Sequence, residues 1–578
     1  MSEPQRATMT PRAAASVSPP PSNGGEGTSA VAAAGAPRHT ALSDFTGTGH
    51  LTWFMLRRDR IRIAVWTVLI ALLYLASLAP GGEYSVLDDD PEARAGRAAT
   101  LSSPAMIAMG GPGYGLDDYR RGPAAANELI LWVTIALAAM TILQVVRHTR
   151  AEEESGRSEL MRAGVLGRHA PSVAVIVEVL LTNAIVATAS MLALVGVGLD
   201  PVDSAVMSFG IALAALVYGA VALVTSQVAE GSGGALGMAF GVLGVTYVAR
   251  VIGDIQEPHG SALSWLSPIA WVHQTRVFVD TRLWPLGIAV VVALVLLVVA
   301  ALLGSHRDFG AGMVKVRNGR ADASPLLSGP VALAWARQWS ALLWTALGLA
   351  AMWFAVGTIL TEVPNMLEAV GDNPIYDQLL KGSGEEMVKV FAAFIAAYSA
   401  FGAGAYAIVM MLRAKAEEDA TRAALVLAKP VARLRWLLSA VLVVTVVSLV
   451  VLFSGIWAMA LGGYAAGLDS ISFGEFTGLA LAYTPAVLVI LAFTLAVYSW
   501  IPRASGVAWA LYGWMFLVLM FAEMLDLPDW LRGLSPFWWV KNTLSETMPV
   551  GHTLGLLGVA LALLLVALVG FRRRDIHG

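Results

Sequence analysis

Apolar runs of about 20 residues recur along the whole chain, and they limit its fold more than any other feature. A helix of this length crosses the hydrocarbon core of a bilayer, which is about 30 Å thick. Only 14% of the residues are charged, whereas about 25% are charged in a soluble domain. A soluble protein would have to bury all of these runs in one core. The runs therefore predict an all-α polytopic membrane protein, because helices satisfy their own backbone hydrogen bonds in lipid.

Window hydropathy divides the chain into about twelve spans. In the first part of the chain we expect them near residues 62–80, 126–147, 171–199, 205–228, 233–253 and 284–304. In the second part we expect them near residues 334–360, 388–412, 436–462, 476–500, 505–526 and 551–570. The number depends on dividing 171–228 and 476–526 at short polar breaks.

Basic residues gather in alternate loops, and this pattern predicts the orientation. They precede the first span, follow the second and eighth spans, join the two parts of the chain and close it. The opposite loops are more acidic, as at Asp88 to Asp90 and Glu362 to Asp377. Because cytoplasmic loops carry the excess of Lys and Arg, both termini are expected on the cytoplasmic side of the cell membrane.

The chain contains two copies of one unit. A charged insert, RAEEESGRSELMRAGVLGR at residues 150–168, aligns without gaps with a second insert, KAEEDATRAALVLAKPVAR at residues 415–433. The segment LSPIAW (266–271) returns as LSPFWW (534–539), and the basic end of the first half resembles the Arg-Arg-Arg-Asp end of the second. An even number of spans in each unit makes the repeats parallel, related by an axis along the membrane normal.

The repeat predicts four parts of the chain. The first residues are rich in Pro, Ala, Ser and Gly and lack the apolar core of a signal peptide, so they read as a disordered tail. The predicted parts are a cytoplasmic tail at 1–44, a six-span half at 45–310, a cytoplasmic linker at 311–330 and a second six-span half at 331–578.

Each insert is expected to form a short cytoplasmic helix. On such a helix Glu153 and Arg157 are i,i+4 neighbours, and so are Glu418 and Arg422, in the favourable order. Leu160 and Leu425 add an apolar contact about one turn further on. A solvated loop is the alternative, but the excess of basic residues in cytoplasmic loops gives no reason for the acidic residues of the inserts. The pattern favours a docking element.

The two inserts, the LSP-x-x-W segments and the Arg-Arg-Arg-Asp tail resemble the permease subunits of bacterial ABC drug exporters. The resemblance is closest to the tetronasin-type (polyketide antibiotic) exporter permeases of actinobacteria, which fuse two six-span halves, and it covers about residues 45–578. It implies that both inserts are coupling helices that dock on a cytoplasmic ATPase. The docking residues it implies are Glu153, Arg157, Leu160, Glu418, Arg422 and Leu425.

The resemblance also implies interfacial elbow helices at Leu51–Arg62 and Val331–Trp339, and short re-entrant helices at the LSP-x-x-W segments. The second insert departs from the first, since Lys429-Pro430 replaces Gly164-Val165. This difference puts equal docking of the two inserts in doubt.

The energy source is expected on another chain. No G-x-x-x-x-G-K-[ST] phosphate-binding loop occurs, so ATP and Mg²⁺ are expected on a separate ABC ATPase, most simply in two copies. The chain has no cysteine, which excludes thiolate metal sites and a cysteine nucleophile. No catalytic residue, metal site, cofactor or nucleic-acid partner is expected on this chain.

An ion-coupled secondary multidrug transporter is the alternative, and it would need ionisable residues inside the spans. Only Glu178 lies well inside one, whereas Glu128, Arg250, Asp254 and Glu523 lie near span ends. An enzyme within the membrane is a third class, but neither H-E-x-x-H nor G-x-S-x-G occurs. The few buried charges favour an external motor.

The substrate is expected to be a small lipophilic molecule, because a mostly apolar cavity suits one. Outward transport is what the resemblance implies. Aromatic residues within the spans are candidates for the lining, although such residues more often serve packing. The candidates are Trp66, Trp132, Tyr218, Tyr247, Tyr398, Tyr483 and Tyr498.

Overall fold

The structure is a computed structural model, and its regular structure is helical throughout the described residues. It describes residues 45–574 except 103, 157–165, 168, 307–311, 314–323, 326, 365–383, 420, 522–526, 541 and 546–547. Within this part of the chain, 11 helices are long and apolar enough to cross a membrane. The prediction of an all-α polytopic membrane protein is therefore confirmed.

The long helices of the first half follow the predicted spans. They are α1 (Thr48–Leu78), α5 (Ile130–His148), α8 (Ala170–Gly196), α9 (Pro201–Val228), α10 (Ser232–Gln256) and α12 (Trp284–His306). A short α4 (Arg121–Ala124) and a π-turn, η4 (Ala125–Leu129), run directly into α5. Three further short helices are α2 (Pro91–Leu101), α3 (Pro104–Met109) and α11 (Pro268–His273).

The second half has the same order of long helices. They are α13 (Pro330–Gly357), α16 (Gly384–Asp419), α18 (Arg433–Ala465), α19 (Phe473–Trp500), α20 (Val507–Phe521) and α22 (Val550–Arg573). The span predicted at 505–526 corresponds to α20, whose 15 residues fall short of a full crossing, and residues 522–526 after it lie outside the described part.

Local sequence signals place several helix starts. Asp200 caps α9 by accepting hydrogen bonds from the backbone of Val202 and Asp203, and Pro201 occupies the first turn. Ser472 and Glu475 form a capping box at the start of α19. These caps satisfy donors that would otherwise be unpaired at helix ends.

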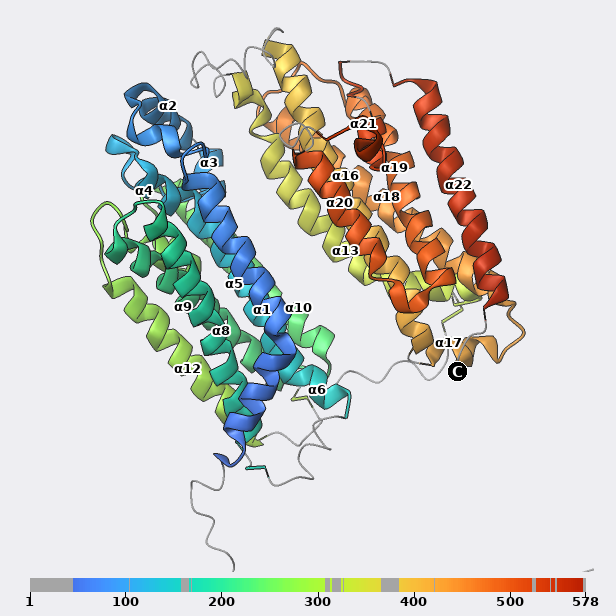
Figure 1. Ribbon diagram of the computed structural model, residues 1–578, viewed down its shortest axis with the longest axis horizontal. Helices are drawn as coiled ribbons and strands as arrows, with labels where there is room; N and C mark the ends of the chain where they lie inside the picture. Colours follow the sequence, from blue (N-terminus) through green and yellow to red (C-terminus); the bar gives the residue numbers. More distant parts are fainter. Residues whose placement is uncertain are drawn as a thin grey trace, which may run out of the picture.

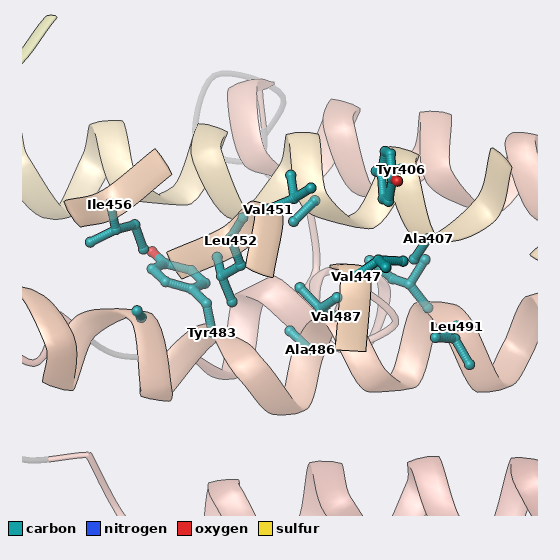
Figure 2. Close-up of a cluster of buried hydrophobic side chains, with 14 of the residues drawn as sticks. Tyr406, Ala407, Val447, Val451, Leu452, Ile456, Tyr483, Ala486, Val487 and Leu491 are labelled. Carbon is teal, nitrogen blue, oxygen red and sulfur yellow. The ribbon is translucent and has the colours of Figure 1, made fainter. Parts of the chain in front are cut away.

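The two halves form separate bundles that stand side by side (Figure 1). The buried apolar clusters follow this division, because one contains side chains from α13 to α22 only and the others contain side chains from α1 to α12 only. In the second half, apolar side chains of α16, α18 and α19 interlock, including Val447, Val451 and Val487 (Figure 2).

Two glycines let α13 and α18 approach closely. A Cβ atom added at Gly357 would lie 2.0 Å from the carbonyl oxygen of Met459, and one at Gly462 would lie 2.0 Å from that of Phe354. Small residues permit this backbone contact, which is a common way for helices to associate in membranes.

The separate elbow helices are not present. Leu51–Arg62 forms the first part of α1, and Val331–Trp339 forms the first part of α13, with no break before the span. Both starts still carry exposed aromatic side chains, such as Trp53 and Trp339. Both segments are helical, but each continues directly into the long helix that follows it, and an interfacial position stays a prediction.

Candidate coupling and substrate sites

The first insert begins with a short helix, α6 (Arg150–Glu154), that is tied to the loop between α9 and α10. Arg150 is buried and donates through Nε to the carbonyl of Glu230 at 2.9 Å. Glu154 accepts from the backbone and the hydroxyl of Ser232, at 3.0 and 2.6 Å. A displacement of α6 would therefore act directly on the start of α10.

Glu153, a predicted docking residue, lies beside Arg150, with 2.7 Å between Oε2 and Nη1. Its predicted partner Arg157, together with Leu160, lies outside the described residues. The docking role of all three stays a prediction.

The second insert is divided into two helices. The long helix α16 ends at Asp419, and α17 (Arg422–Leu427) begins after Thr421, whose φ of 57° is left-handed. Glu418 and Arg422 therefore lie on different helices, and the prediction that they are i,i+4 neighbours on one helix was wrong. Arg422 is exposed on α17, and Leu425 beside it is 74% exposed. An exposed leucine on a short helix is suited to a contact with another protein.

Glu418 instead contacts the C-terminal end of the chain. It accepts a hydrogen bond from the hydroxyl of Tyr498 at 2.6 Å and forms an ion pair with Arg574. Arg574 also donates to the carbonyl of Tyr498 at 3.0 Å and lies over its ring, 4.8 Å from the centroid. Arg574 thus joins the second insert to α19 and to the end of α22, a role that the sequence did not reveal.

One ion pair recurs in both halves. Arg58 near the start of α1 pairs with Glu152 of the first insert at 2.6 Å, and Arg337 near the start of α13 pairs with Glu417 of the second. Glu152 and Glu417 align in the internal repeat. The excess of basic residues in cytoplasmic loops gave no reason for these acidic residues. In the structure they hold each insert to the first long helix of its half.

The LSP-x-x-W segments also share a contact. The indole of Trp271 donates to the carbonyl of Trp265 at 2.8 Å, and that of Trp539 donates to the carbonyl of Gly533 at 2.9 Å. The segments form α11 and the 3-10 turn η8 (Pro536–Trp539). The tryptophan of the motif therefore closes the turn that precedes its own short helix.

A buried polar network links α1 to α5 in the first half. Asp59 accepts from Arg147 Nη1 at 2.6 Å, and it lies 2.8 Å from Nε2 of His148. Nδ1 of His148 lies 2.7 Å from an Arg58 nitrogen, which can only donate. Nδ1 of His148 therefore accepts from Arg58, and Nε2 is directed at Asp59.

Glu178 lies beside this network. Ligand-type atoms of Asp59, His148 and Glu178 all lie within 4.8 Å of one another, and all three side chains are buried. Both nitrogens of His148 are engaged, so its lone pair is not available to a metal ion. The sequence singled out Glu178, but not Asp59 and His148, which are distant in the chain. The arrangement favours a hydrogen-bonded network over a metal centre.

Other ionisable groups considered for ion coupling are paired near the opposite end. Glu128 accepts from Arg97, with a nearest distance of 2.5 Å, and from the hydroxyls of Tyr84 and Tyr119, both at 3.1 Å. Burial raises the pKa of both tyrosines, so both hydroxyls remain donors.

Arg250 and Asp254 form a second such pair. They lie 2.6 Å apart, and Arg250 also donates to the carbonyls of Ile107 and Ala108 on α3. Glu523 lies outside the described residues. Glu128, Arg250 and Asp254 therefore hold the segments at this end of the first bundle in place.

Comparison with known proteins connects these features to a family. The chain is 33% identical over 545 residues to the multidrug efflux system permease protein Rv1217c of Mycobacterium tuberculosis, covering 93% of this chain and 96% of the relative. Residues 327–572 match the family of the C-terminal domain of multidrug efflux system permease Rv1217c. The chain belongs to the multidrug efflux permeases. It is a multi-pass membrane protein and the transmembrane part of a drug exporter.

The aromatic candidates occupy varied places in this permease. Tyr218 is buried and shares a 2.8 Å hydrogen bond with Thr246, and buried Tyr483 donates to the carbonyl of Ala393 at 3.4 Å. Trp132 is 47% exposed. The hydroxyl of Tyr247 lies 3.5 Å from the carbonyl of Ala108, and Tyr398 packs edge-on against Phe394. The hydrogen bonds of Tyr218 and Tyr483 fit a packing role.

Trp66 lines a cavity of the permease. This first-half cavity has a volume of about 460 Å³ and lies between α1, α5, α8 and α10. A second cavity, of about 410 Å³, lies between α13, α16, α17 and α18 and is lined by Arg337, Arg413, Glu417 and Arg422. Both cavities adjoin the inserts, and their linings differ.

Proposed function

We propose that this permease is the membrane-spanning subunit of an ATP-driven ABC exporter of the tetronasin type, which moves a lipophilic drug or antibiotic out of the cell. Separate ATPase subunits, one for each half, bind ATP and Mg²⁺ and supply the energy. The supporting observation is the pair of short helices α6 and α17, which lie at one end of the two bundles, together with the C-terminus (Figure 1).

Each insert has a direct route into its half. An ATPase that pushes on α6 acts through the Arg58–Glu152 pair on α1 and through Glu154 and Ser232 on α10. A push on α17 acts through the Arg337–Glu417 pair on α13. The adjoining Glu418–Arg574 pair extends this route to the end of α22. The closing of the two ATPases would in this way switch the substrate pathway from inward-facing to outward-facing.

The proposal also assigns an orientation in the membrane. The proposal puts both termini, α6 and α17 on the cytoplasmic side, where the basic residues gather. The α2, α3, α4 and α21 (Asp529–Arg532) segments lie at the opposite end (Figure 1).

The test is to separate the energy source from the permease. We expect the purified chain alone neither to bind nor to hydrolyse ATP. Cells that export a drug through the permease should lose that resistance when its ATPase partner is deleted. Resistance that survives this deletion would contradict the proposal.

One observation favours the ion-coupled alternative, namely the buried Glu178 beside Asp59 and His148. A carrier of that class would depend on the proton gradient and would need no ATPase. Collapse of the gradient in cells with ATP maintained separates the two functions. The ABC proposal expects export to continue under these conditions.

A further inference from the structure

The first half contains a buried carboxylate with an incomplete set of partners. Glu178 is fully buried and Gln144 is 7% exposed. The amide nitrogen of Gln144 donates to one oxygen of Glu178 and to the hydroxyl of Thr182. Among the described residues, Oε2 of Glu178 and Oε1 of Gln144 have no hydrogen-bond donor. Two acceptor oxygens on neighbouring helices thus require donors.

The neighbouring cations are already paired. Arg147 bonds to Asp59, and Arg58 bonds to Glu152 and His148. Within the described residues, no ion pair joins Glu178 to a cation. A buried carboxylate is costly without a positive partner, and an ionisable group inside a span is by default a candidate for function.

A cavity adjoins the side chains that surround these oxygens. Gln144 and Thr182 line the first-half cavity of about 460 Å³, so Glu178 lies one side chain behind its wall. Asp59 lines another part of it. The remaining wall includes the apolar side chains of Trp66, Met140 and Leu143. It also includes Arg147, which is paired with Asp59, and the exposed Arg62. The cavity therefore has an apolar surface on one side, and on another a polar corner formed by Gln144 and Thr182 with Glu178 behind them.

The second half shows that the fold does not require this corner. In the register that aligns the two inserts, valines stand at the positions of Gln144, Glu178 and Thr182, namely Val409, Val443 and Val447. Val443 and Val447 are buried, and Val447 packs among apolar side chains (Figure 2). Since valines fill the same positions of the repeat, the polar residues of the first half serve another purpose.

We infer that Gln144, Glu178 and Thr182 form a recognition site for the ammonium group of a lipophilic amine, with the apolar part of the amine against Trp66, Met140 and Leu143. A primary or secondary ammonium supplies a positively charged partner for Glu178. It also has two N–H donors, one for Oε2 of Glu178 and one for Oε1 of Gln144. This inference names a substrate class and rests on the proposed export of drugs.

The test compares two probes that differ at one nitrogen. Dansylcadaverine carries a primary ammonium, and N-acetyl-dansylcadaverine has the same fluorophore and chain without the charge. Binding is measured with the full chain in nanodiscs, without ATP or ATPase. We expect the purified chain to bind the amine at least tenfold more tightly than the acetylated probe, which corresponds to about 1.4 kcal/mol.

Substitutions test whether Glu178 and Thr182 cause the preference for the amine probe. Glu178→Gln keeps the shape of the side chain and should remove the preference for the amine without changing binding of the acetylated probe. Glu178→Val and Thr182→Val, which introduce the second-half residues, should also weaken binding of the amine. Asp280→Asn is the control, because Asp280 is exposed and pairs with Arg282 in a loop. Thermal unfolding in nanodiscs confirms that each variant is folded.

Unchanged preference in a folded Glu178→Gln variant would overturn the inference. The inference is also overturned if the variant changes only the pH dependence of transport, equally for both probes, since Glu178 would then bind a proton only. These outcomes are distinct from failure of the proposed function, which would appear as drug export without the ATPase, whatever the result of the binding assay.

Discussion

An ion pair connects each insert to the first long helix of its half, and the Arg58–Glu152 pair can be tested by substitution. Replacing Glu152 with Gln leaves Arg58 without its partly buried partner, so we expect the free energy of unfolding to fall by about 1–3 kcal/mol. Reversing both charges, in Arg58→Glu with Glu152→Arg, should restore part of this loss if the pair is the cause. Thermal unfolding of the single and double variants measures it, and equal loss in both would contradict the pairing.

Leu425 provides a residue-scale test of docking. It is 74% exposed, so Leu425→Asp should change the free energy of unfolding by less than about 0.5 kcal/mol. Association with the ATPase should fall by about tenfold or more if the side chain is buried in the complex, because each 1.4 kcal/mol is tenfold. Val86→Asp, at an exposed position of the opposite end, is the matched control. A pull-down in which both variants bind equally would remove α17 from the interface.

For single residues, the sequence showed which ones were unusual, but it did not show which residues they contact. Glu178 and the acidic residues of the inserts were recognised because their charge conflicts with their surroundings. Their partners were not, since Arg58 and Glu152 lie 94 residues apart and Glu418 and Arg574 lie 156 apart. Periodicity and composition carry no information about contacts of this length.

At the scale of helices, the crossing of α13 and α18 depends on glycine. Gly462→Ala would place a methyl group 2.0 Å from the carbonyl oxygen of Phe354, so the helices must separate, at a cost of about 1–3 kcal/mol. Gly348→Ala on α13 has open space around it and should be neutral or slightly stabilising. Thermal unfolding of the two variants decides the matter, and equal stability would mean that the crossing is looser than described.

The C-terminal end of α22 should control the mobility of the second insert. Removing residues 572–578 deletes Arg574, which holds Glu418 beside Tyr498. We expect faster amide hydrogen exchange in α17 and in the last turns of α16. Exchange in α6 should not change, which provides a control within the same molecule. Tyr498→Phe removes one hydrogen bond of the same set and should give a smaller effect in the same place.

Hydropathy predicted the helix positions well, because an apolar run long enough to cross the bilayer is expected to form a helix. The breaks between helices were harder to predict. The elbow segments continue into α1 and α13, and the second insert divides at Thr421 although its residues favour one helix. Packing against neighbouring helices and the chain terminus sets these details, and no local pattern encodes it.

For the whole molecule, the orientation remains a prediction that cysteine labelling can test, since the chain has no native cysteine. Thr421→Cys on the second insert should resist a membrane-impermeant maleimide in intact cells and react after lysis. Glu257→Cys, at the exposed end of α10, should react from outside. The reverse pattern would invert the orientation and remove the inserts from the reach of a cytoplasmic ATPase.

The valines that replace the polar corner in the second half have a consequence for the symmetry of the transporter. In a transporter assembled from two identical chains, a substitution arises in both copies at once, so an acidic group suited to one copy must be tolerated in the other. Here both copies lie on a single chain, and each position can change by itself. In the register of the repeat, Glu178 therefore has no acidic counterpart in the second half, where Val443 stands at its position. In the proposed exporter, a substrate bound at that corner would contact the first half only, and two identical ATPases would act on halves that are not interchangeable.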